Sequence, residues 1–405
     1  MDSIIKIKFI ITISVLMLLL IGCWDRIDIE SRALIIGMGI DSPDENEIIK
    51  FEQEIEDKDL LKKIKPKYKL SLEILNPQAF QKGSQSSGGG GNAVKKSIAI
   101  TEEGRSITQA MEKIQPKTDR ILTPTHTQLI IINEKIAREG IWEIIDCYIM
   151  DPFCPRRAVV LVSSEPAFNI LNAQLETKES PSLFINKIIE MKLEGVRIVE
   201  SSAGKVYNKM ITNSGFVVPK VIKTGNNLGL SGAAVFRESK MIGWLNPLEL
   251  EGQQWASLRG KEEVQAGLVT ITDPEDGNNI FVVKILGMQK KIKSVEKNSK
   301  ITIFIEINVT GEIVYTPHKW VFADKTIKKL EKEMDTTMEK MIKESIKKSK
   351  EDFKTDIYGY NELIRENHPE YWKKHKDNWH ETFSSNEVDV RVEVKSNIRR
   401  MGGLR

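Results

Sequence analysis

Residues 300–314 carry the most regular alternation of side chains in the chain. Because successive side chains of a strand point to opposite faces, this pattern predicts a strand with one buried and one largely wet face. A similar alternation over 388–395 predicts a closing strand of the same sheet. The apolar positions of the first strand are Ile301, Ile303, Ile305, Ile307 and Val309.

The segment between these strands predicts helices. Apolar residues recur at three- and four-residue steps from Lys325 to Phe353, which is the pattern of an amphipathic helix with a solvated Lys/Glu face. Pro369 is suited to the first position of a further helix. We therefore expect residues 289–405 to form a C-terminal domain, an antiparallel or mixed sheet covered on one face by the long helix. The aromatic residues expected at the ends of its core are Trp372 and Trp379.

Residues 23–200 predict an N-terminal domain. The apolar run 33–40 predicts a buried strand in which Gly37 and Gly39 indicate the close approach of another element. Residues 47–56 are expected to be the return strand of a hairpin. Further strands are expected at 68–75, 94–101, 128–132 and 158–162, and helices at 106–114, 134–149, 166–173 and 182–193.

Residues 201–288 are expected to form a middle domain. An extended segment is expected at 207–223, a hairpin at 231–245 and a helix from Asn246. The whole chain thus predicts an α+β fold, and its 405 residues are enough for two or three domains. The Gly/Ser-rich stretch 83–92 is expected to be a flexible loop within the first domain, since a strand pattern resumes directly after it.

The N-terminus predicts a lipoprotein signal over residues 1–22. Lys6 and Lys8 precede an apolar run, Phe9–Ile21, and Leu20-Ile21-Gly22-Cys23 matches a bacterial lipobox. The thiol of Cys23 would take an S-diacylglycerol group, and its amine an N-acyl group after cleavage. Two alternatives are an uncleaved membrane anchor and an ordinary secretory signal. The apolar run has 13 residues, whereas a membrane span needs about 20.

Composition and charge limit the function classes. The chain has 405 residues, of which 40% are hydrophobic and 29% charged, and its net charge is +3. This is a globular composition, and its balanced charge argues against a nucleic-acid partner. Cys147 and Cys154 leave a disulfide and two free thiols open as alternatives, with free thiols favoured.

We find no pattern for catalysis, metal binding or a cofactor. Nucleophile-elbow, zinc-protease and Cys-x-x-Cys motifs are absent from the sequence. The five histidines are scattered, and His375 and His380 lie five residues apart, so they do not share a helix face. The sequence therefore predicts a protein that is not an enzyme.

Three separated blocks resemble the spore-germination C-subunit lipoproteins, the Ger(x)C family. The N-terminal block runs from Gly22-Cys-Trp-Asp-Arg-Ile-Asp-Ile-Glu30 into Ile36-Gly-Met-Gly-Ile-Asp41. The central block contains Ser231-Gly-Ala-Ala-Val-Phe236 and Met241-Ile-Gly-Trp-Leu-Asn246. The C-terminal block contains Asp356-Ile-Tyr-Gly-Tyr360, Pro369-Glu-Tyr-Trp372, Trp379 and Ile398-Arg-Arg-Met-Gly402. The stretch 83–92 departs from the family pattern as a local insertion.

The resemblance implies about three α+β domains and a lipid-anchored subunit on the outer face of the spore inner membrane. Its partners would be the integral-membrane A- and B-type subunits of a nutrient germinant receptor. Of family functional residues, only the lipidated Cys23 carries over to this chain. The alternative is a solute-binding lipoprotein that captures the germinant directly. That reading is disfavoured because such proteins have two doubly wound lobes, whereas residues 289–405 predict a half-exposed sheet under one helix.

Overall fold

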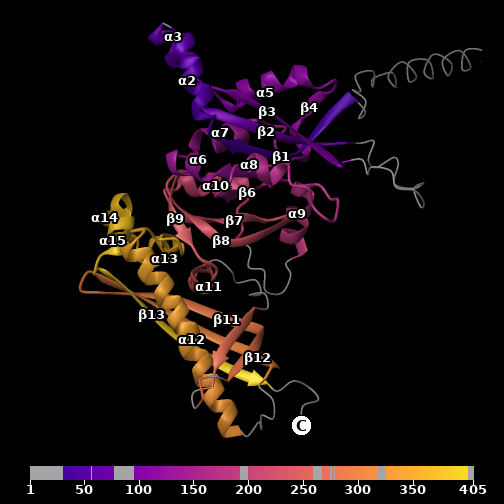
Figure 1. The fold of residues 1–405 in the computed structure, drawn as a ribbon. Coiled ribbons are helices and arrows are strands. Elements are labelled where there is room, and N and C mark those ends of the chain that lie inside the picture. Colours follow the sequence, from indigo (N-terminus) through magenta and orange to yellow (C-terminus); the bar gives the residue numbers. More distant parts are fainter. Residues whose placement is uncertain are drawn as a thin grey trace, which may run out of the picture.

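The computed structural model describes residues 31–76, 95–191, 199–258, 267–316 and 324–399, apart from 56, 274, 275 and 278. It has an α+β fold with two sheets, as the sequence predicts. Figure 1 shows the larger sheet with its helices at one end of the molecule and the smaller sheet, crossed by the long helix α12, at the other.

The larger sheet has nine strands in the order β3-β2-β1-β5-β6-β7-β8-β9, and β4 also pairs with β1. The centre of the sheet is parallel from β1 through β5 and β6 to β7, and both flanks are antiparallel. The strands are β1 (Arg32–Asp41), β2 (Tyr68–Leu75), β3 (Ser97–Gly104), β4 (Ile121–Thr123), β5 (Leu129–Asn133), β6 (Val159–Ser163), β7 (Phe216–Thr224), β8 (Asn227–Arg237) and β9 (Lys240–Leu245).

Helices cover both faces of this sheet. One core contains side chains of α5, α6, α7 and α10, and a second core on the other face contains those of α8 and α9. A Cβ on Gly37 would lie 2.0 Å from Ser182 Oγ of α9, so the predicted close approach is confirmed. The helices of this region are α2 (Glu45–Glu54), α3 (Lys58–Ile64), α5 (Ile107–Ile114), η2 (Gln115–Lys117), η3 (Pro124–His126), α6 (Glu134–Glu139), α7 (Trp142–Met150), α8 (Ala167–Leu171), α9 (Pro181–Met191) and α10 (Ala203–Ile211).

Three predicted elements are wrong. The return strand expected at 47–56 is the helix α2, because Asp44 caps its first turn by accepting a hydrogen bond from Asn46 N, and the antiparallel partner of β1 is β2 instead. The helix expected at 134–149 is two helices, separated at Gly140. The first part of the extended segment expected at 207–223 is helical, as the end of α10.

The smaller sheet has the order β10-β11-β12-β13, and its β12–β13 pair is parallel. The predicted strands 300–314 and 388–395 are therefore neighbours in one sheet, and α12 packs its apolar stripe on their buried face, as expected. The elements are α11 (Pro247–Ala256), β10 (Leu268–Thr272), β11 (Ile280–Lys297), β12 (Lys300–Tyr315), α12 (Asp324–Glu351), α13 (Tyr360–Asn367), α14 (Pro369–His375), η4 (Lys376–Asn378), α15 (Trp379–Ser384) and β13 (Val388–Arg399).

The division into domains at residues 200 and 288 stays a prediction. Neither boundary separates one sheet from the other: β7–β9 continue the larger sheet beyond residue 200, and residue 288 lies within β11. The core of the smaller sheet also extends through α11 to residues of β7–β9, such as Val217 and Val235. The two sheets are thus joined by a shared apolar core. The loop expected at 83–92 lies outside the described residues.

Candidate functional site

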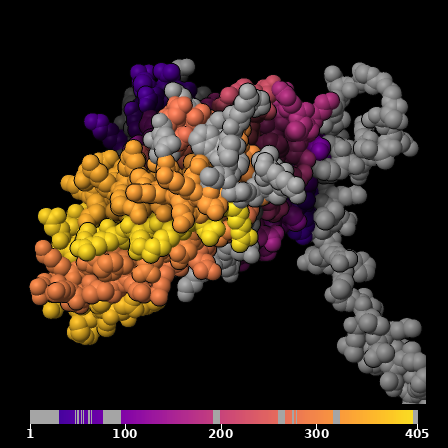
Figure 2. Space-filling model, turned by 90° about the horizontal axis from the view of Figure 1, so that it is seen from below, coloured from indigo at the N-terminus to yellow at the C-terminus, as the bar shows by residue number. Residues whose placement is uncertain are grey.

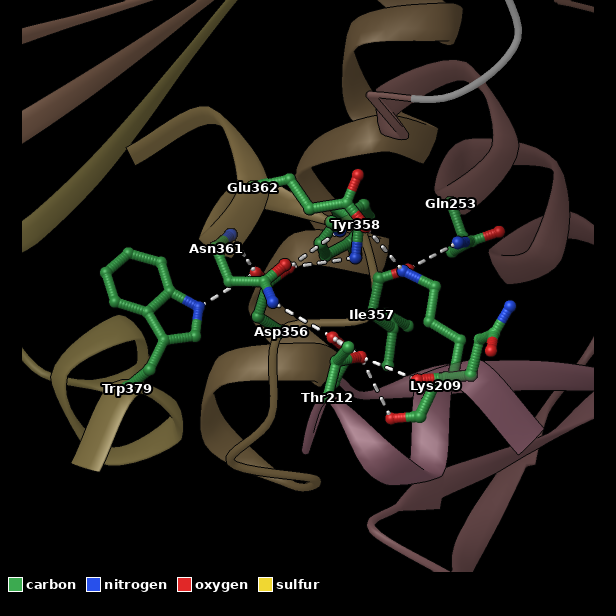
Figure 3. Close-up of polar contacts among 12 residues, drawn as sticks. Lys209, Thr212, Gln253, Asp356, Ile357, Tyr358, Asn361, Glu362 and Trp379 are labelled. Carbon is green, nitrogen blue, oxygen red and sulfur yellow. Dashed lines mark hydrogen bonds and ion pairs between the residues drawn. The ribbon is translucent and has the colours of Figure 1, made fainter. Parts of the chain in front are cut away.

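A buried polar cluster lies where the two sheets meet, and we call it the polar junction. It comprises the turn 212–215 after α10, Gln253 of α11, the segment 355–361, and Trp379 and His380 of α15. Figure 3 shows part of this cluster, including Gln253, Asp356, Asn361 and Trp379. Four of its members, namely Asp356, Asn361, Trp379 and His380, are at most 9% exposed. The junction therefore lies in the interior and is built from segments that are far apart in the sequence.

Asp356 is the centre of the junction. Its Oδ1 accepts hydrogen bonds from the backbone N–H groups of Tyr358, at 2.9 Å, and Gly359, at 3.2 Å. Its Oδ2 accepts from Asn361 N at 2.8 Å and from Trp379 Nε1 at 2.9 Å. A carboxylate that accepts several N–H bonds is well suited to burial. This one satisfies free N–H groups before and within the first turn of α13 and fixes Trp379.

The segment 355–361 is held against the larger sheet by direct contacts. Asn361 Nδ2 donates to Ser214 Oγ at 2.9 Å. Gly215 permits this approach, because a Cβ there would lie 2.4 Å from Asp356 O. Any larger residue at position 215 would push the segment away from the turn after α10.

His380 forms a second connection across the junction. Its Nδ1 accepts from Asp356 N at 3.3 Å, which places the ring proton on Nε2, from which it is donated to Asn213 O at 3.0 Å. Thr355 Oγ1 lies 2.9 Å from Nδ1, so its hydroxyl group is a second donor to this nitrogen. Burial lowers the pKa of His380, which favours this neutral form.

The helix α11 and two ion pairs surround this centre. Gln253 Nε2 donates to Ile357 O at 2.8 Å, and Tyr360 Oη donates to Ala256 O at 3.0 Å. Lys209 of α10 pairs with Glu362 of α13 at 3.2 Å. The second pair joins Arg237 of β8 to Glu381 of α15. Each ion pair thus joins an element of the larger sheet to the C-terminal region.

The geometry of the junction fits a structural role. Both ring nitrogens of His380 and both oxygens of Asp356 are engaged by protein groups. Within the described part of the chain, no group of three His, Cys, Asp or Glu side chains is placed to hold a metal ion. The arrangement positions two regions of the molecule relative to each other.

The residues singled out from the sequence lie elsewhere. Cys23 lies outside the described residues. Cys147 of α7 and Cys154 are free cysteines in the structure, and burial raises the pKa of the Cys154 thiol to about 12. His126 lies 2.9 Å from Thr125 Oγ1 at an exposed turn, while His375 stacks on Tyr371 at 4.3 Å between ring centroids.

Sequence reasoning identified Asp356 as a position of family resemblance and Trp379 also as a core aromatic residue. It missed the hydrogen bond between them and the approach of Asp356 to Gly215. The available signal was the Asn213-Ser214-Gly215 turn between a helix and a strand. The sequence of a turn does not indicate which distant residues it contacts, so the polar junction could be identified only from the folded structure.

Two family models match consecutive parts of the chain. "Spore germination protein N-terminal domain" matches residues 25–223, and "Spore germination B3/ GerAC like, C-terminal" matches residues 231–402. The chain belongs to the GerAC family of spore germination proteins. The two family regions meet in the β7–β8 hairpin, and the junction brings residues of the N-terminal region, such as Ser214, into contact with Asn361 of the C-terminal region.

Relatives of this GerAC-family protein match it over nearly its whole length. "Spore germination protein YndF" of Bacillus subtilis (strain 168) is 26% identical over 392 residues, which cover 95% of this chain and 94% of the relative. "Spore germination protein KC" of the same strain is 26% identical over 417 residues, covering 96% and 95%.

A solved structure supports the fold. The crystal structure of the GerBC protein matches with a TM-score of 0.57 and 21% identity, covering 82% of this chain and 93% of that chain. At this identity, the match shows a common fold. Among the described helices of the present chain, none is long and apolar enough to cross a membrane.

Proposed function

We propose that this protein is a lipid-anchored, non-enzymatic subunit of a nutrient germinant receptor complex and is needed for nutrient-triggered spore germination. It would lie on the outer face of the spore inner membrane, attached through lipid on Cys23. Its partners would be the integral-membrane A- and B-type receptor subunits. The single observation that carries this proposal is the match of both spore-germination family models, over residues 25–223 and 231–402.

The N-terminal sequence supports the anchoring part of the proposal. The family match begins at Asp25, two residues after the lipobox cysteine. A single acyl chain gives only marginal membrane binding, at about 0.8 kcal/mol for each buried methylene, whereas several chains on one residue give durable attachment. Lipidated Cys23 would therefore keep the folded body at the membrane without a spanning helix of its own.

The polar junction supports a structural role in the complex. Its hydrogen bonds support one relative orientation of the two sheets, because they connect the turn 212–215 with Asn361 and His380. We propose that this fixed orientation presents surfaces of both regions to the membrane subunits together.

Replacement of one sulfur tests the anchor. In Cys23→Ala, we expect an unprocessed precursor without lipid, because the substituted side chain cannot form the thioether. Cys147→Ala is the matched control and should be processed normally. Mass spectrometry of the N-terminus decides between the outcomes, and a normal lipidated N-terminus in Cys23→Ala would refute the anchor.

Isolation of the protein from spore membranes tests the complex. We expect mass spectrometry of the co-purifying proteins to identify the two types of integral-membrane subunit, and deletion of the protein to abolish germination in response to at least one nutrient. Direct capture of a germinant makes a different prediction. A nutrient that binds the purified protein would raise its melting temperature in a concentration-dependent way, and such a shift would favour the solute-binding alternative.

A further inference from the structure

The larger sheet has one end at which β1 begins, and the first residue of β1, Arg32, is only nine residues after the proposed anchor Cys23. β1, β5 and β6 are parallel and begin at this end, and β4 pairs beside the first residues of β1, with Arg32 opposite Ile121. Figure 1 shows β4 and the beginning of β1 together at this end. The loop that precedes β6 reaches the same end, where Tyr148 Oη donates to Pro155 O at 3.1 Å.

Large apolar side chains are exposed at this end. Phe153 is 67% exposed, Met150 is 64% exposed and Ile121 is 50% exposed. The position of Phe153 is fixed by a turn, because Phe153 N donates to Asp151 Oδ1 at 2.8 Å and Cys154 N donates to Asp151 O at 3.1 Å. Burial of Cys154 beneath this turn leaves Phe153 directed outward.

Two arginines follow the exposed Phe153 in the loop before β6. Arg156 and Arg157 are both exposed. Within the described residues, neither lies in an ion pair. Three acids lie near this end: Asp151, which accepts from Phe153 N, Asp119, which lies 3.9 Å from Arg120, and Glu200, which pairs with Lys205. Among the described residues, Asp151 is the one of these acids that lies in no ion pair, so the two arginines leave this end with a net positive charge beside its exposed apolar side chains.

We infer that these residues form a membrane-docking surface, which we call the rim: Ile121, Met150, Phe153, Arg156 and Arg157. Apolar and aromatic side chains enter the interfacial layer of a bilayer, and arginines bind the anionic lipid headgroups beside them. The rim thus gives the protein a second membrane contact, which orients the larger sheet on the surface.

The choice of a lipid partner rests on the proposed anchor at Cys23. Nine residue steps separate Cys23 from Arg32, and an extended chain of this length reaches at most about 30 Å. An acylated Cys23 would therefore hold the rim within this distance of the bilayer. The basic pair is also complementary to an anionic lipid surface.

Vesicle binding of the unlipidated protein tests the rim. The chain from Trp24 to Arg405 lacks only the signal peptide and Cys23 and keeps every described residue. We expect it to sediment with vesicles that contain about 30% phosphatidylglycerol more strongly than with pure phosphatidylcholine, and to be released at about 0.5 M salt. Because this chain carries no lipid, the result is independent of the Cys23→Ala experiment, so failure of the rim and failure of the anchor are distinguishable.

Substitutions locate the binding surface. Arg156→Ser with Arg157→Ser should weaken binding to anionic vesicles about 25-fold, since each cation near such a surface contributes about five-fold. Met150→Ser with Phe153→Ser should weaken it about ten-fold or more. The matched controls, Lys340→Ser with Lys347→Ser and Leu248→Ser with Leu268→Ser, carry equally exposed residues of α12, α11 and β10 and should bind within about two-fold of the wild type.

Thermal unfolding of each variant confirms that it is folded. Absence of vesicle binding by the folded wild-type chain would overturn the inference, as would equal binding by the rim variants and the controls. Rim variants whose unlipidated chains bind anionic vesicles as well as the wild type, but whose lipidated forms lose co-purification with the membrane subunits, would assign this surface to a protein partner and would likewise overturn it.

Discussion

The central strands of the larger sheet are buried on both faces, whereas the smaller sheet is buried on one. In β5 the first four residues are all buried, and their side chains alternate between two separate cores. In β12 buried residues alternate with exposed or half-buried ones. A polar side chain in the larger sheet must therefore find partners inside the protein, whereas many in the smaller sheet can face water.

The sheets also differ in how carboxylates are used. Glu73 of β2 is fully buried and accepts hydrogen bonds from Ser97, Ser180 and Ser182. In the smaller sheet, carboxylates of α12 instead cover part of the free edge of β13, and Figure 2 shows β13 in yellow beside α12 in orange. The backbone N–H groups of Val394, Ser396 and Ile398 donate to Glu339, Asp335 and Glu331, respectively. These three backbone donors are therefore not available to another strand.

The largest expected effect tests the core that the smaller sheet shares with the polar junction. Trp379→Ala should lower the free energy of unfolding by about 3–5 kcal/mol, because it empties a buried aromatic site. The control is Trp372→Ala. Trp372 is half-buried, with its ring centroid 5.6 Å from that of Trp379, so its replacement should lower the free energy of unfolding by less. Denaturant unfolding should use the whole mature chain, because the core around Trp379 also includes residues of β7–β9 and α11. An unchanged midpoint in Trp379→Ala would contradict the core assignment.

A second substitution tests whether the two sheets unfold together. Asp356→Asn should cost about 2–3 kcal/mol, because the amide supplies only one acceptor oxygen for the four N–H donors around it. We also expect the unfolding transition to separate into two steps, monitored by near- and far-UV circular dichroism. The exposed neighbour in Asp352→Asn is the control. One unaltered transition in Asp356→Asn would show that the junction does not couple the sheets.

The edge of the smaller sheet provides a third test. Asp335→Ala should lower the free energy of unfolding by about 1–2 kcal/mol, because the Ser396 N–H loses an acceptor at 2.7 Å. Self-association should rise as the edge becomes available. Asp335→Asn keeps an acceptor and should restore most of the stability, and Glu344→Ala, on the exposed face of α12, should have little effect. Urea unfolding and analytical ultracentrifugation measure the two consequences.

The same difference in burial decided how well the sequence predicted each region. The strand 300–314 and its neighbour 388–395 were predicted because a sheet with one wet face produces alternation along both strands. A fully buried strand such as β1 was recognised from its apolar residues, but its neighbour was assigned wrongly. Alternation was absent from β1, and the charged segment 47–56 was placed beside it although Asp44 indicates a helix start.

The polar junction was less accessible to prediction. Asp356 and Trp379 were noted as family positions, but their hydrogen bonds join residues 23 apart, and those of His380 to Asn213 span 167 positions. Periodicity describes neighbours along an element and contains no information on such pairs. The lipidation of Cys23 stays a prediction that depends on the local motif alone.

The smallest expected effect is a pH dependence that belongs to the larger sheet. Burial raises the pKa of Glu73 above its usual value. The folded state therefore holds this proton at a higher pH than the unfolded chain, whose Glu pKa is about 4.3. As the pH falls from about 7.5 towards that value, the contribution of Glu73 to the free energy of unfolding should become more favourable.

Glu73→Gln keeps the size of the side chain but cannot titrate, so it should lack this gain. Urea unfolding of wild type and variant at about pH 7.5 and pH 5.5 measures the difference, and other titrating groups cancel in the comparison. Glu112→Gln, at an exposed position of α5, should follow the wild type. If Glu73→Gln and the wild type change in parallel, the carboxylate of Glu73 has the same proton affinity in the folded and unfolded states, and burial on both faces of the sheet does not govern its charge.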